Sequence, residues 1–327
     1  MSKNGIVRRR TFLGAVAGTL AAPAIGRAQA WPNKPVRVVN AYSAGGTADV
    51  VCRIYCQALG ERLGQSFTVD NKPGAAGTIA AQIVARAPND GYTILYDATA
   101  QSVNPSLFAG KLSYDTQRDL LPIAQTMQTP VTLMRNAQFQ AKTVPELIAL
   151  AKSKPGALDC ASTGVGTVQH VSLELLNQKA GIKINHVPYK EMGSVRNDLF
   201  AGRIPLLFSN VPGTVALLTS KDVACMAHTG PKPVAVLPGV PAISEVIPGF
   251  ETWEWNGLFA PAGTDPALIS RLNAEVNTVM KMDSVAKRLA ELGALTQPNT
   301  VVEFTAFREK QIAFFAEMVK SADIRIE

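Results

Sequence analysis

Short apolar runs and segments of helical spacing alternate along most of the chain. Val36–Ala41, Phe67–Asp70 and Tyr92–Tyr96 are rich in β-branched or aromatic residues, which is typical of buried strands. Helical spacing fills the intervals between them, at Asp49–Leu63 and Thr78–Ala87. Because strands separated by helices of this length form parallel βαβ units, the pattern predicts an α/β protein.

The same alternation returns after a less regular stretch, Ala98–Gln128. The further predicted strands are Leu158–Ser162, Ile182–Val187, Ile204–Phe208 and Val223–Ala227. The helices predicted with them are Thr143–Lys154, Thr167–Ala180, Ser194–Ala201, Ala267–Met280, Val285–Leu292 and a last helix capped by Thr300 and Glu303. The simplest architecture is two α/β lobes, with the C-terminal helices packed back on the first.

Composition narrows the class of protein. The chain has 327 residues, of which 47% are apolar and 17% charged, so it is long enough for two cores and is neither disordered nor collagen-like. Residues 1–30 hold five basic residues and no acid, which accounts for five of the net +7 and leaves the remainder nearly neutral. We therefore expect no nucleic-acid partner.

The first 30 residues have the layout of an export signal. Arg8-Arg9-Arg10 precedes an apolar run, Phe12–Ala24, which is too short for a bilayer span of about 20 residues. Small residues follow at Ala28-Gln29-Ala30, where a signal peptidase would cleave after Ala30. Arg9–Leu13 resembles a twin-arginine signal, and an ordinary export signal stays the alternative. The mature chain would start at Trp31 without a lipidated cysteine, so we expect it free in the periplasm.

Cysteine and histidine spacing gives no metal or disulfide framework. Cys52 and Cys56 lie four residues apart on a predicted helix, a poor geometry for a disulfide. The three histidines are scattered and supply no set of metal ligands. We expect all four cysteines, including Cys160 and Cys225, to be small core residues, and we predict no metal or cofactor.

Three loops of small residues carry the candidate chemistry. Ser43–Thr47, Gly74–Gly77 and Thr163–Thr167 each lie between a predicted strand and a predicted helix. Glycine lets a ligand approach the backbone, and a helix N-terminus contributes about 0.3–2 kcal/mol toward a bound carboxylate. Any one loop is also explained as a tight βα turn. Three loops spread over both lobes favour a cleft lined by anion-binding loops, at the carboxyl ends of the strands.

Enzyme motifs are incomplete. Ala41–Gly45 differs by one residue from the G-x-S-x-G nucleophile elbow, with Ser43 in the nucleophile position. The candidate bases for such a serine hydrolase are His170, His186 and His228. However, the elbow would follow the first strand of the mature chain, where hydrolase sheets have several strands before it. Gly164-Val165-Gly166 lacks the third glycine of a dinucleotide fingerprint. We predict that the protein is not an enzyme.

A series of short motifs extends in order through the mature chain. Its members are Trp31-Pro32-Asn33-Lys34-Pro35, Gly45-Gly46 with Asp49, Asn71-Lys72-Pro73-Gly74 with Gly77, Ala87-Pro88-Asn89-Asp90-Gly91-Tyr92-Thr93, Gly164-Val165-Gly166-Thr167 with His170, His186-Val187-Pro188-Tyr189-Lys190, and Ala260-Pro261-Ala262-Gly263-Thr264. In these motifs the chain resembles the Bug/TctC periplasmic solute-binding receptors of tripartite tricarboxylate transporters. Single motifs are weak, but the ordered series is highly specific.

The resemblance implies a type II periplasmic-binding-protein fold, in which crossover strands join two α/β lobes that close over a ligand cleft. It implies that residues 31–130 start lobe 1, 131–252 form lobe 2, and 253–327 return to lobe 1. The ligand would be a small organic carboxylate, held largely by backbone N–H groups and bridging waters. The partners would be membrane permease subunits, and the receptor would be a monomer. A ligand sensor without transport, or a secreted hydrolase using Ser43, are the alternatives.

The loop argument and the resemblance together predict the ligand-binding residues, among which Asp49 would orient the first loop. The set is Tyr42, Ser43, Ala44, Gly45, Gly46, Thr47, Asp49, Gly77, Thr99, Gln101, Ser162, Thr163, Gly166, Thr167, His170, Tyr189 and Asn210. Two residues depart from the family's usual pattern near the predicted pocket, since Tyr42 adds a hydroxyl and Glu191 a negative charge. Which carboxylate binds stays open: citrate-like, dicarboxylate, amino-acid and aromatic acids all fit.

Overall fold

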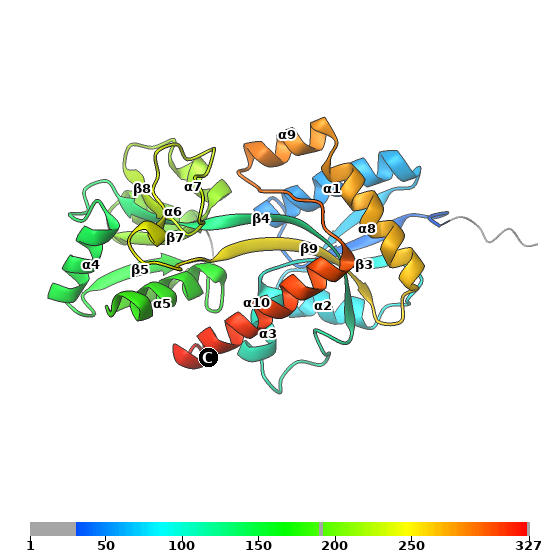
Figure 1. Cartoon of the computed structure of the whole chain (residues 1–327), viewed down its shortest axis with the longest axis horizontal. Coiled ribbons are helices and arrows are strands. Elements are labelled where there is room, and N and C mark those ends of the chain that lie inside the picture. Colours follow the sequence, from blue (N-terminus) through cyan, green and yellow to red (C-terminus); the bar gives the residue numbers. More distant parts are fainter. Residues whose placement is uncertain (1–30, 190–191, 326–327) are drawn as a thin grey trace, which may run out of the picture. The chain divides into compact units, whose positions relative to one another are not determined.

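The computed structural model (Figure 1) describes residues 31–189 and 192–325, so the predicted export signal and Glu191 lie outside the described residues. The strands are β1 (Val36–Asn40), β2 (Phe67–Asn71), β3 (Thr93–Ala98), β4 (Leu120–Asn136), β5 (Leu158–Ser162), β6 (Ile184–Pro188), β7 (Leu206–Asn210), β8 (Val223–His228) and β9 (Trp253–Pro261). The helices are α1 (Thr47–Leu63), α2 (Thr78–Ala85), α3 (Ala100–Leu107), α4 (Val144–Ser153), α5 (Val168–Ala180), α6 (Met192–Phe200), α7 (Val211–Leu217), α8 (Pro266–Met280), α9 (Asp283–Glu291) and α10 (Val301–Ser321), with short 3₁₀ helices η1 (Ala75–Gly77) and η2 (Ile243–Glu245).

Two groups of strands are joined through β4 and β9. The strand order is β2-β1-β3-β9-β4-β7-β5-β6, and β8 pairs with β4. Pairing is parallel between β1 and its neighbours and between β5 and its neighbours, whereas every pairing of β4 and β9 is antiparallel. Figure 1 shows β4 and β9 side by side between the two groups. The α/β class with two lobes and crossover strands is confirmed, and the antiparallel pairings of β4 and β9 were not predicted from the pattern.

The less regular stretch Ala98–Gln128 contains α3 and the beginning of β4, which the pattern did not predict. Pro105 lies inside α3, and the 17-residue β4 contains Pro122 and Pro130. Nearly all of β4 is buried, and its register with β9 shifts near Pro122. A strand that is buried on both faces, bulged and interrupted by proline shows no period of two, so its sequence does not look like a strand.

Helix ends follow the local signals in the sequence. Thr300 accepts a hydrogen bond from the Glu303 N–H, and the Glu303 carboxylate accepts one from the Thr300 N–H, as predicted for this capping box. Thr143 Oγ1 accepts a hydrogen bond from the Glu146 N–H and caps α4, while the Glu146 carboxylate accepts from the Lys142 N–H rather than from Thr143. Gly181 ends α5 in the left-handed conformation, which glycine adopts without strain. These three predicted helix boundaries are confirmed.

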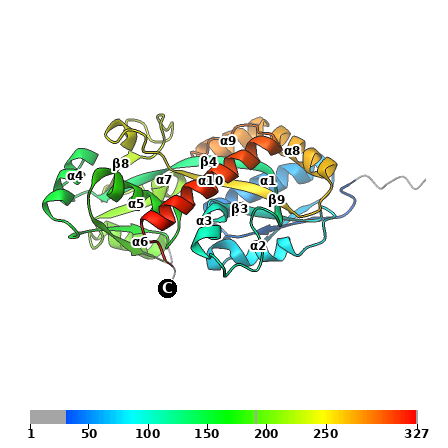
Figure 2. The same ribbon diagram turned by 60° about the horizontal axis from the view of Figure 1, so that its bottom comes forward.

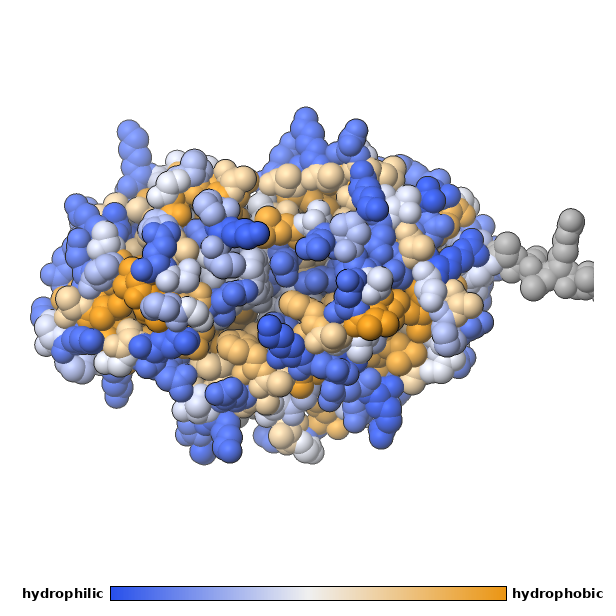
Figure 3. All heavy atoms as spheres, viewed as in Figure 1, coloured by the Kyte–Doolittle hydropathy of each residue, from blue (hydrophilic) through white to orange (hydrophobic). Residues whose placement is uncertain are grey.

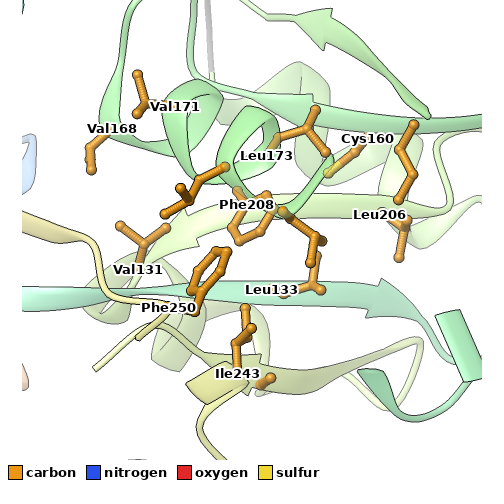
Figure 4. Packing of buried hydrophobic residues seen from close by; sticks show 14 of the residues in the cluster. Val131, Leu133, Cys160, Val168, Val171, Leu173, Leu206, Phe208, Ile243 and Phe250 are labelled. Carbon is orange, nitrogen blue, oxygen red and sulfur yellow. The ribbon is translucent and has the colours of Figure 1, made fainter. Parts of the chain in front are cut away.

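Each lobe has its own core, and helix α10 contributes to both. In the second lobe Phe208, Leu133 and Val171 pack together from β7, β4 and α5 (Figure 4). Phe304 of α10 belongs to the core of the first lobe, whereas Phe315 of the same helix belongs to the core of the second. Figure 2 shows α10 crossing from one group of strands toward the other, with α3 beside it. The exact lobe boundaries stay a prediction.

The cysteines are largely core residues. Cys52 and Cys56 are buried on α1 with their sulfur atoms 3.8 Å apart, and Cys160 is buried on β5. Cys225 is only half-buried, so the prediction of a core position is wrong for that residue in part. Burial raises the pKa of the Cys225 thiol to about 12, which keeps it protonated and unreactive. In the part of the chain that the structure describes, no cluster of His, Cys, Asp or Glu is suited to hold a metal ion.

Candidate ligand-binding site

The first predicted loop connects β1 to α1 and is exposed. Asn40 ends the strand, and Gly46 stands at the N-cap of α1 with an extended backbone. Ser43–Gly46 are exposed, and Tyr42 is half-buried beside them. Gly45 has a φ of 81°, a left-handed conformation that favours glycine. The loop therefore presents its backbone outward at the N-terminus of a 17-residue helix.

The Asp49 carboxylate fixes the conformation of this loop through hydrogen bonds. Its carboxylate accepts hydrogen bonds from the Gly45 N–H (2.9 Å), from Asn71 Nδ2 (2.8 Å) and from Arg53 Nε (2.9 Å). Burial acts to raise the pKa of Asp49, but the hydrogen bonds from Arg53, Asn71 and Gly45 outweigh it and lower the pKa to about 2. A carboxylate that stays ionised and accepts these hydrogen bonds can fix the orientation of the loop. The role predicted for Asp49 agrees with this geometry and stays a prediction.

Only some N–H groups of the first loop are available to a ligand. The Tyr42 N–H donates to Asn40 Oδ1 (3.3 Å), and the Gly46 N–H donates to the Ser43 carbonyl (3.4 Å). The Gly45 N–H is taken by Asp49, as described above. Within the described part of the chain, the N–H groups of Ser43 and Ala44 have no acceptor. The open donors are thus adjacent in sequence and exposed.

The glycine loop before α2 packs behind the first loop. Gly77 ends η1 with a φ of 85°, and a Cβ placed on it would lie 3.2 Å from the Ala41 side chain and from Asp97 Oδ1. The carbonyl of Ala76 accepts a hydrogen bond from Asn104 Nδ2 (2.8 Å), which ties η1 to α3. Gly77 is therefore brought to the end of β1, where it allows close packing rather than offering an exposed face.

The second loop, Ser162–Thr167, connects β5 to α5 and is held from within. Ser162 Oγ accepts a hydrogen bond from the Gly164 N–H (3.1 Å) and lies 2.6 Å from His186 Nε2. Thr167 Oγ1 donates to the Gly164 carbonyl (2.8 Å) and accepts from the His170 N–H (3.3 Å), so it caps α5. The hydroxyl groups of Ser162 and Thr167 are thus used to shape the loop.

Two histidines extend this internal network. The rings of His170 and His186 stack with centroids 3.6 Å apart, and the Gly166 N–H donates to His170 Nδ1 (3.2 Å). Burial, with a smaller contribution from His170, lowers the pKa of His186 to about 3. His186 is therefore neutral at ordinary pH. The geometry shows His170 supporting the loop, and a ligand contact by His170 stays a prediction.

Residues of α3 and β9 lie directly against the second loop and its helix. A Cβ on Gly166 would overlap the Leu107 side chain at the end of α3. On α5, Gln169 Nε2 donates to Glu254 Oε2 of β9 (3.2 Å). Thr163 Oγ1 in turn lies 3.5 Å from the amide oxygen of Gln169. The second loop therefore lies against α3, which follows β3 directly, and near β9, which pairs with β3.

The predicted wall at Ala98–Gln101 begins α3. Thr99 Oγ1 accepts a hydrogen bond from the Trp255 N–H (2.9 Å), which attaches the start of α3 to β9. Gln101 is fully buried, and neither polar atom of its amide has a hydrogen-bond partner in the described residues. A buried, unpartnered amide calls for an explanation such as bound water or ligand. Of the two predicted residues, Gln101 is the one with free hydrogen-bonding capacity.

Tyr189 and Asn210 have their polar atoms occupied. The Tyr189 N–H donates to the Ser162 carbonyl (3.0 Å), and its hydroxyl donates to Asp198 Oδ2 (2.7 Å). Asn210 caps α7 by accepting from the Gly213 N–H (2.9 Å). Tyr189 therefore lies beside the second loop, whereas no hydrogen bond in the described residues joins Asn210 to either loop, and a ligand contact by either residue stays a prediction.

Two carboxyl groups near the first loop were not predicted from the sequence. Asp97 is fully buried at the end of β3, and burial raises its pKa to about 8. Glu254 lies on β9, and burial raises its pKa to about 7. Burial raises the pKa of Tyr42, and the charges of Asp97 and Glu254 raise it further, so both carboxyl groups lie near the Tyr42 side chain. The sequence signal that could have identified Asp97 was an acidic residue inside the apolar strand Thr93–Ala98.

A large cavity lies elsewhere on the molecule. It has a volume of about 630 Å³ and is lined by β4 and β9 together with residues 231–234, residues 295–299 and the start of α10. None of the predicted site residues lines it. On the face of the molecule that Figure 3 shows, hydrophilic residues are widespread and apolar residues form separate groups between them.

The hydrolase alternative finds no support in the geometry. Within the described residues, no histidine forms a hydrogen bond with Ser43. The Ser–His contact that exists joins Ser162 to His186, and Ser162 is fully buried inside the second loop. A nucleophile must be reachable by its substrate, so this pair is structural.

Known proteins resemble this chain over most of its length. None of the helices in the described part of the chain is both long and apolar enough to cross a bilayer. "UPF0065 protein in tcbD-tcbE intergenic region" of Pseudomonas sp. (strain P51) is 34% identical over 294 residues, which cover 89% of this chain and 87% of that protein. R. palustris Rpa4515, solved with adipate, has a TM-score of 0.82 and 31% identity, covering 90% of this chain and 99% of that one. MatC (Rpa3494) from Rhodopseudomonas palustris, solved with bound malate, has a TM-score of 0.77 and 30% identity, covering 88% of this chain and 99% of that one.

The family assignment rests on these likenesses and on a separate match. Residues 51–320 match the sequence model of the "Tripartite tricarboxylate transporter family receptor". The two α/β lobes and the crossover strands β4 and β9 agree with the solved structures of this group. The chain therefore belongs to the TctC family of tripartite tricarboxylate transporter receptors, which are periplasmic solute-binding proteins.

Proposed function

We propose that this protein captures a small organic carboxylate between its two lobes, in the periplasm, and delivers it to a permease of the tripartite tricarboxylate type. The ligand would be held by backbone N–H groups and bridging waters of the loops Tyr42–Thr47 and Ser162–Thr167. It would be bound unchanged, by a monomer, without catalysis.

The observation that carries this proposal is the exposed pair of N–H donors at Ser43 and Ala44. They lie in the loop that leads into α1, where the helix N-terminus favours negative charge. Gly45 and Gly46 leave space for a ligand, since a Cβ on Gly45 would meet nothing within 4 Å. The adipate and malate complexes of two relatives support a carboxylate as the ligand.

The second loop supplies a fixed wall on the other side of the ligand. Its internal hydrogen bonds keep Thr163 and Gly166 in one position, and Leu107 of α3 packs against it. A preformed wall reduces the entropy that binding must offset. We therefore expect ligand binding to order the first loop more than the second.

A thermal-shift screen of residues 31–327 against mono-, di- and tricarboxylates tests the proposal. A ligand present at about 1,000 times its dissociation constant adds about 4 kcal/mol to the free energy of unfolding, a shift of several degrees in Tm. The protein is first unfolded and refolded, to remove any ligand that co-purified. No shift with any acid after refolding would contradict carboxylate binding.

Delivery is tested separately in cells. Deleting the gene is expected to abolish uptake of the radiolabelled acid found in the screen, and restoring the gene is expected to recover it. Normal uptake in the deletion strain, with a lost transcriptional response to the same acid, would contradict transport and indicate a sensor.

A further inference from the structure

The large cavity beside the crossover strands is separate from the two loops, and the proposed function makes no use of it. Its volume of about 630 Å³ falls within the range of about 300–1,000 Å³ that is typical of small-molecule sites. Pro130 of β4 and Trp253 of β9 are register partners, and both line it. A cavity of this size at the two crossover strands (Figure 1) is a candidate site for a second ligand.

One wall of the cavity is the segment 295–299, which hydrogen bonds attach to β4. The Leu295 N–H donates to the Gln128 carbonyl (2.7 Å), and the Gln128 N–H donates to the Leu295 carbonyl (2.9 Å). At the other end of the segment, Asn299 Oδ1 accepts from the Gln125 N–H (3.0 Å), and Asn299 Nδ2 donates to the Gln125 carbonyl (2.9 Å). Because the segment is held at both ends, this wall is preformed.

A second wall, residues 231–234, is supported by a different part of the molecule. Gly230 precedes it and packs on β4, since a Cβ on Gly230 would lie 3.1 Å from the Pro130 side chain. Val234 ends it and is buried together with Val211 in a small apolar cluster. The cavity therefore has two separately supported walls and does not depend on a single exposed loop.

The lining of the cavity is largely aromatic and apolar. It includes Trp253, Phe304 and Phe307, together with four prolines. Phe304 and Phe307 each pack edge-on against Trp255, with ring centroids 5.8 and 5.7 Å apart. The indole N–H of Trp253 donates to the Glu251 carboxylate. Rings that are already held in place offer contact area to an apolar ligand without a large loss of entropy on binding.

Two charged residues line the cavity, and they differ in whether they are paired. The Glu303 carboxylate accepts hydrogen bonds from the Thr300 N–H (2.8 Å) and from the Thr300 hydroxyl (2.9 Å), at the N-terminus of α10. Lys232 is exposed and forms no ion pair within residues 31–189 and 192–325. The unpaired charge at the cavity is therefore positive, which favours an anionic ligand.

We infer that this cavity binds a small aromatic monocarboxylate, with its ring against Trp253 and Phe307 and its carboxylate paired with Lys232. The site is distinct from the proposed carboxylate site between the lobes, because none of the residues predicted for that site lines the cavity. A di- or tricarboxylate is a poor match, since an apolar lining does not replace the water around additional charges. An uncharged aromatic molecule would bury its ring but leave Lys232 unpaired.

Three ligands with the same ring and chain test this assignment. Isothermal titration of the refolded mature protein compares 3-phenylpropanoate, 3-phenylpropan-1-ol and 3-phenylpropan-1-amine, which end in an anionic, a neutral and a cationic group. We expect the acid to bind with a Kd below about 1 mM, about threefold more tightly than the alcohol, because an exposed ion pair contributes modestly. The amine should bind more weakly still. No binding of the acid up to about 10 mM, or tighter binding of the amine, would overturn the inference.

Variants then locate the bound acid. Trp253→Ala is expected to weaken binding of 3-phenylpropanoate at least about tenfold, with Val302→Ala, an exposed apolar change outside the lining, as the matched control. Lys232→Met is expected to remove the preference for the acid over the alcohol, with the exposed Lys221→Met as its control. Circular dichroism and Tm show whether each variant is folded. A preference that persists in folded Lys232→Met would overturn the pairing with Lys232.

Gly46→Val distinguishes this cavity from the proposed carboxylate site. The change lies in the first loop, so we expect it to leave the affinity for 3-phenylpropanoate unchanged. Loss of that affinity in folded Gly46→Val, with full affinity in folded Trp253→Ala, would place the aromatic acid at the first loop and overturn the inference. The two proposals can fail separately, because the two sites share none of their residues.

Discussion

The first loop exposes Ser43–Gly46 and is fixed mainly by Asp49, whereas the second loop is fixed by Ser162, Thr167 and a stacked histidine pair. Both loops join a strand to a helix and both contain glycine at positive φ. In the first, the space around Gly45 is open, while in the second a Cβ on Gly166 would overlap Leu107. Similar sequence patterns have therefore produced two different local structures.

The difference indicates that the two loops have separate roles. A loop with free N–H groups and open space can adapt to a ligand, whereas a loop whose polar groups are already paired contributes shape. Substitutions in the second loop should therefore reduce stability, and substitutions in the first should reduce affinity. The predictions below test that separation, beginning with the largest effect.

Gly166→Ala is expected to lower the free energy of unfolding by about 2–4 kcal/mol. An alanine at a φ of 75° costs about 1 kcal/mol, and its overlap with Leu107 adds about 1–3 kcal/mol. Urea unfolding followed by circular dichroism measures the change.

Gly45→Ala is the matched control, because its φ is 81° and nothing lies within 4 Å of the added Cβ. It is expected to cost about 1 kcal/mol. Leu107→Ala combined with Gly166→Ala should destabilise less than the sum of the two single changes, since the overlap is then removed. Equal losses in Gly45→Ala and Gly166→Ala would show that the two loops do not differ in packing.

Most of the fold was predictable because its signals are local. Capping residues such as Thr143 and Thr300, and the short apolar strands β1 and β5, act within a few residues of themselves. The resemblance to TctC receptors, now confirmed, implied the fold with two lobes, whose boundaries stay a prediction. The strand β4 was missed because proline and burial on both faces remove the alternation that identifies a strand.

The site was predictable only as far as glycine patterns extend. They placed both loops, yet they did not show that the hydroxyls of Ser162 and Thr167 are used internally. They also did not show that Asp97 and Glu254 come close to Tyr42, because these residues are distant in sequence and meet only through the order of strands β1, β3 and β9. Spatial proximity of this kind has no local signature in one sequence.

Gly46→Val is expected to weaken binding of the acid identified in the screen by at least about tenfold, or about 1.4 kcal/mol. Gly46 has a φ of −74°, and a Cβ there would touch only the Ser43 carbonyl, at 3.5 Å, so the variant should fold. The branched side chain would block the approach of a ligand to the loop backbone. Titration calorimetry measures affinity, with Gly46→Ala as the milder control. Full affinity in folded Gly46→Val would exclude this loop from the site.

As the pH falls, the second loop should lose stability at a higher pH than the first loop does. His186 has its pKa lowered to about 3 by burial, so between about pH 6.5 and pH 3 the unfolded chain binds a proton that the folded chain does not. Stability from this group therefore falls as pH falls through that window. Asp49 in the first loop, with its pKa of about 2, stays ionised there.

From about pH 7 to about pH 5, we expect the wild type to lose about 1 kcal/mol more of its free energy of unfolding than His186→Gln does. His186→Gln should be less stable at neutral pH, because it loses the stacking on His170, but its stability should depend less on pH. Urea unfolding at each pH gives both quantities. Parallel pH profiles for the two proteins would contradict the burial of a neutral His186.

Ser43→Ala should have the smallest effect, changing affinity by less than about threefold, because the backbone N–H of residue 43 is kept and the hydroxyl has no partner in the described residues. Ser162→Ala is the contrasting change: it should cost about 1–2 kcal/mol of stability, since Gly164 N–H and His186 lose their partner. Titration calorimetry, urea unfolding and turnover of p-nitrophenyl acetate are measured on both. A large loss of affinity in Ser43→Ala would indicate that the ligand contacts the side chain of residue 43 rather than its backbone. Ester turnover by the wild type that is lost in Ser43→Ala would indicate a hydrolase instead of a receptor.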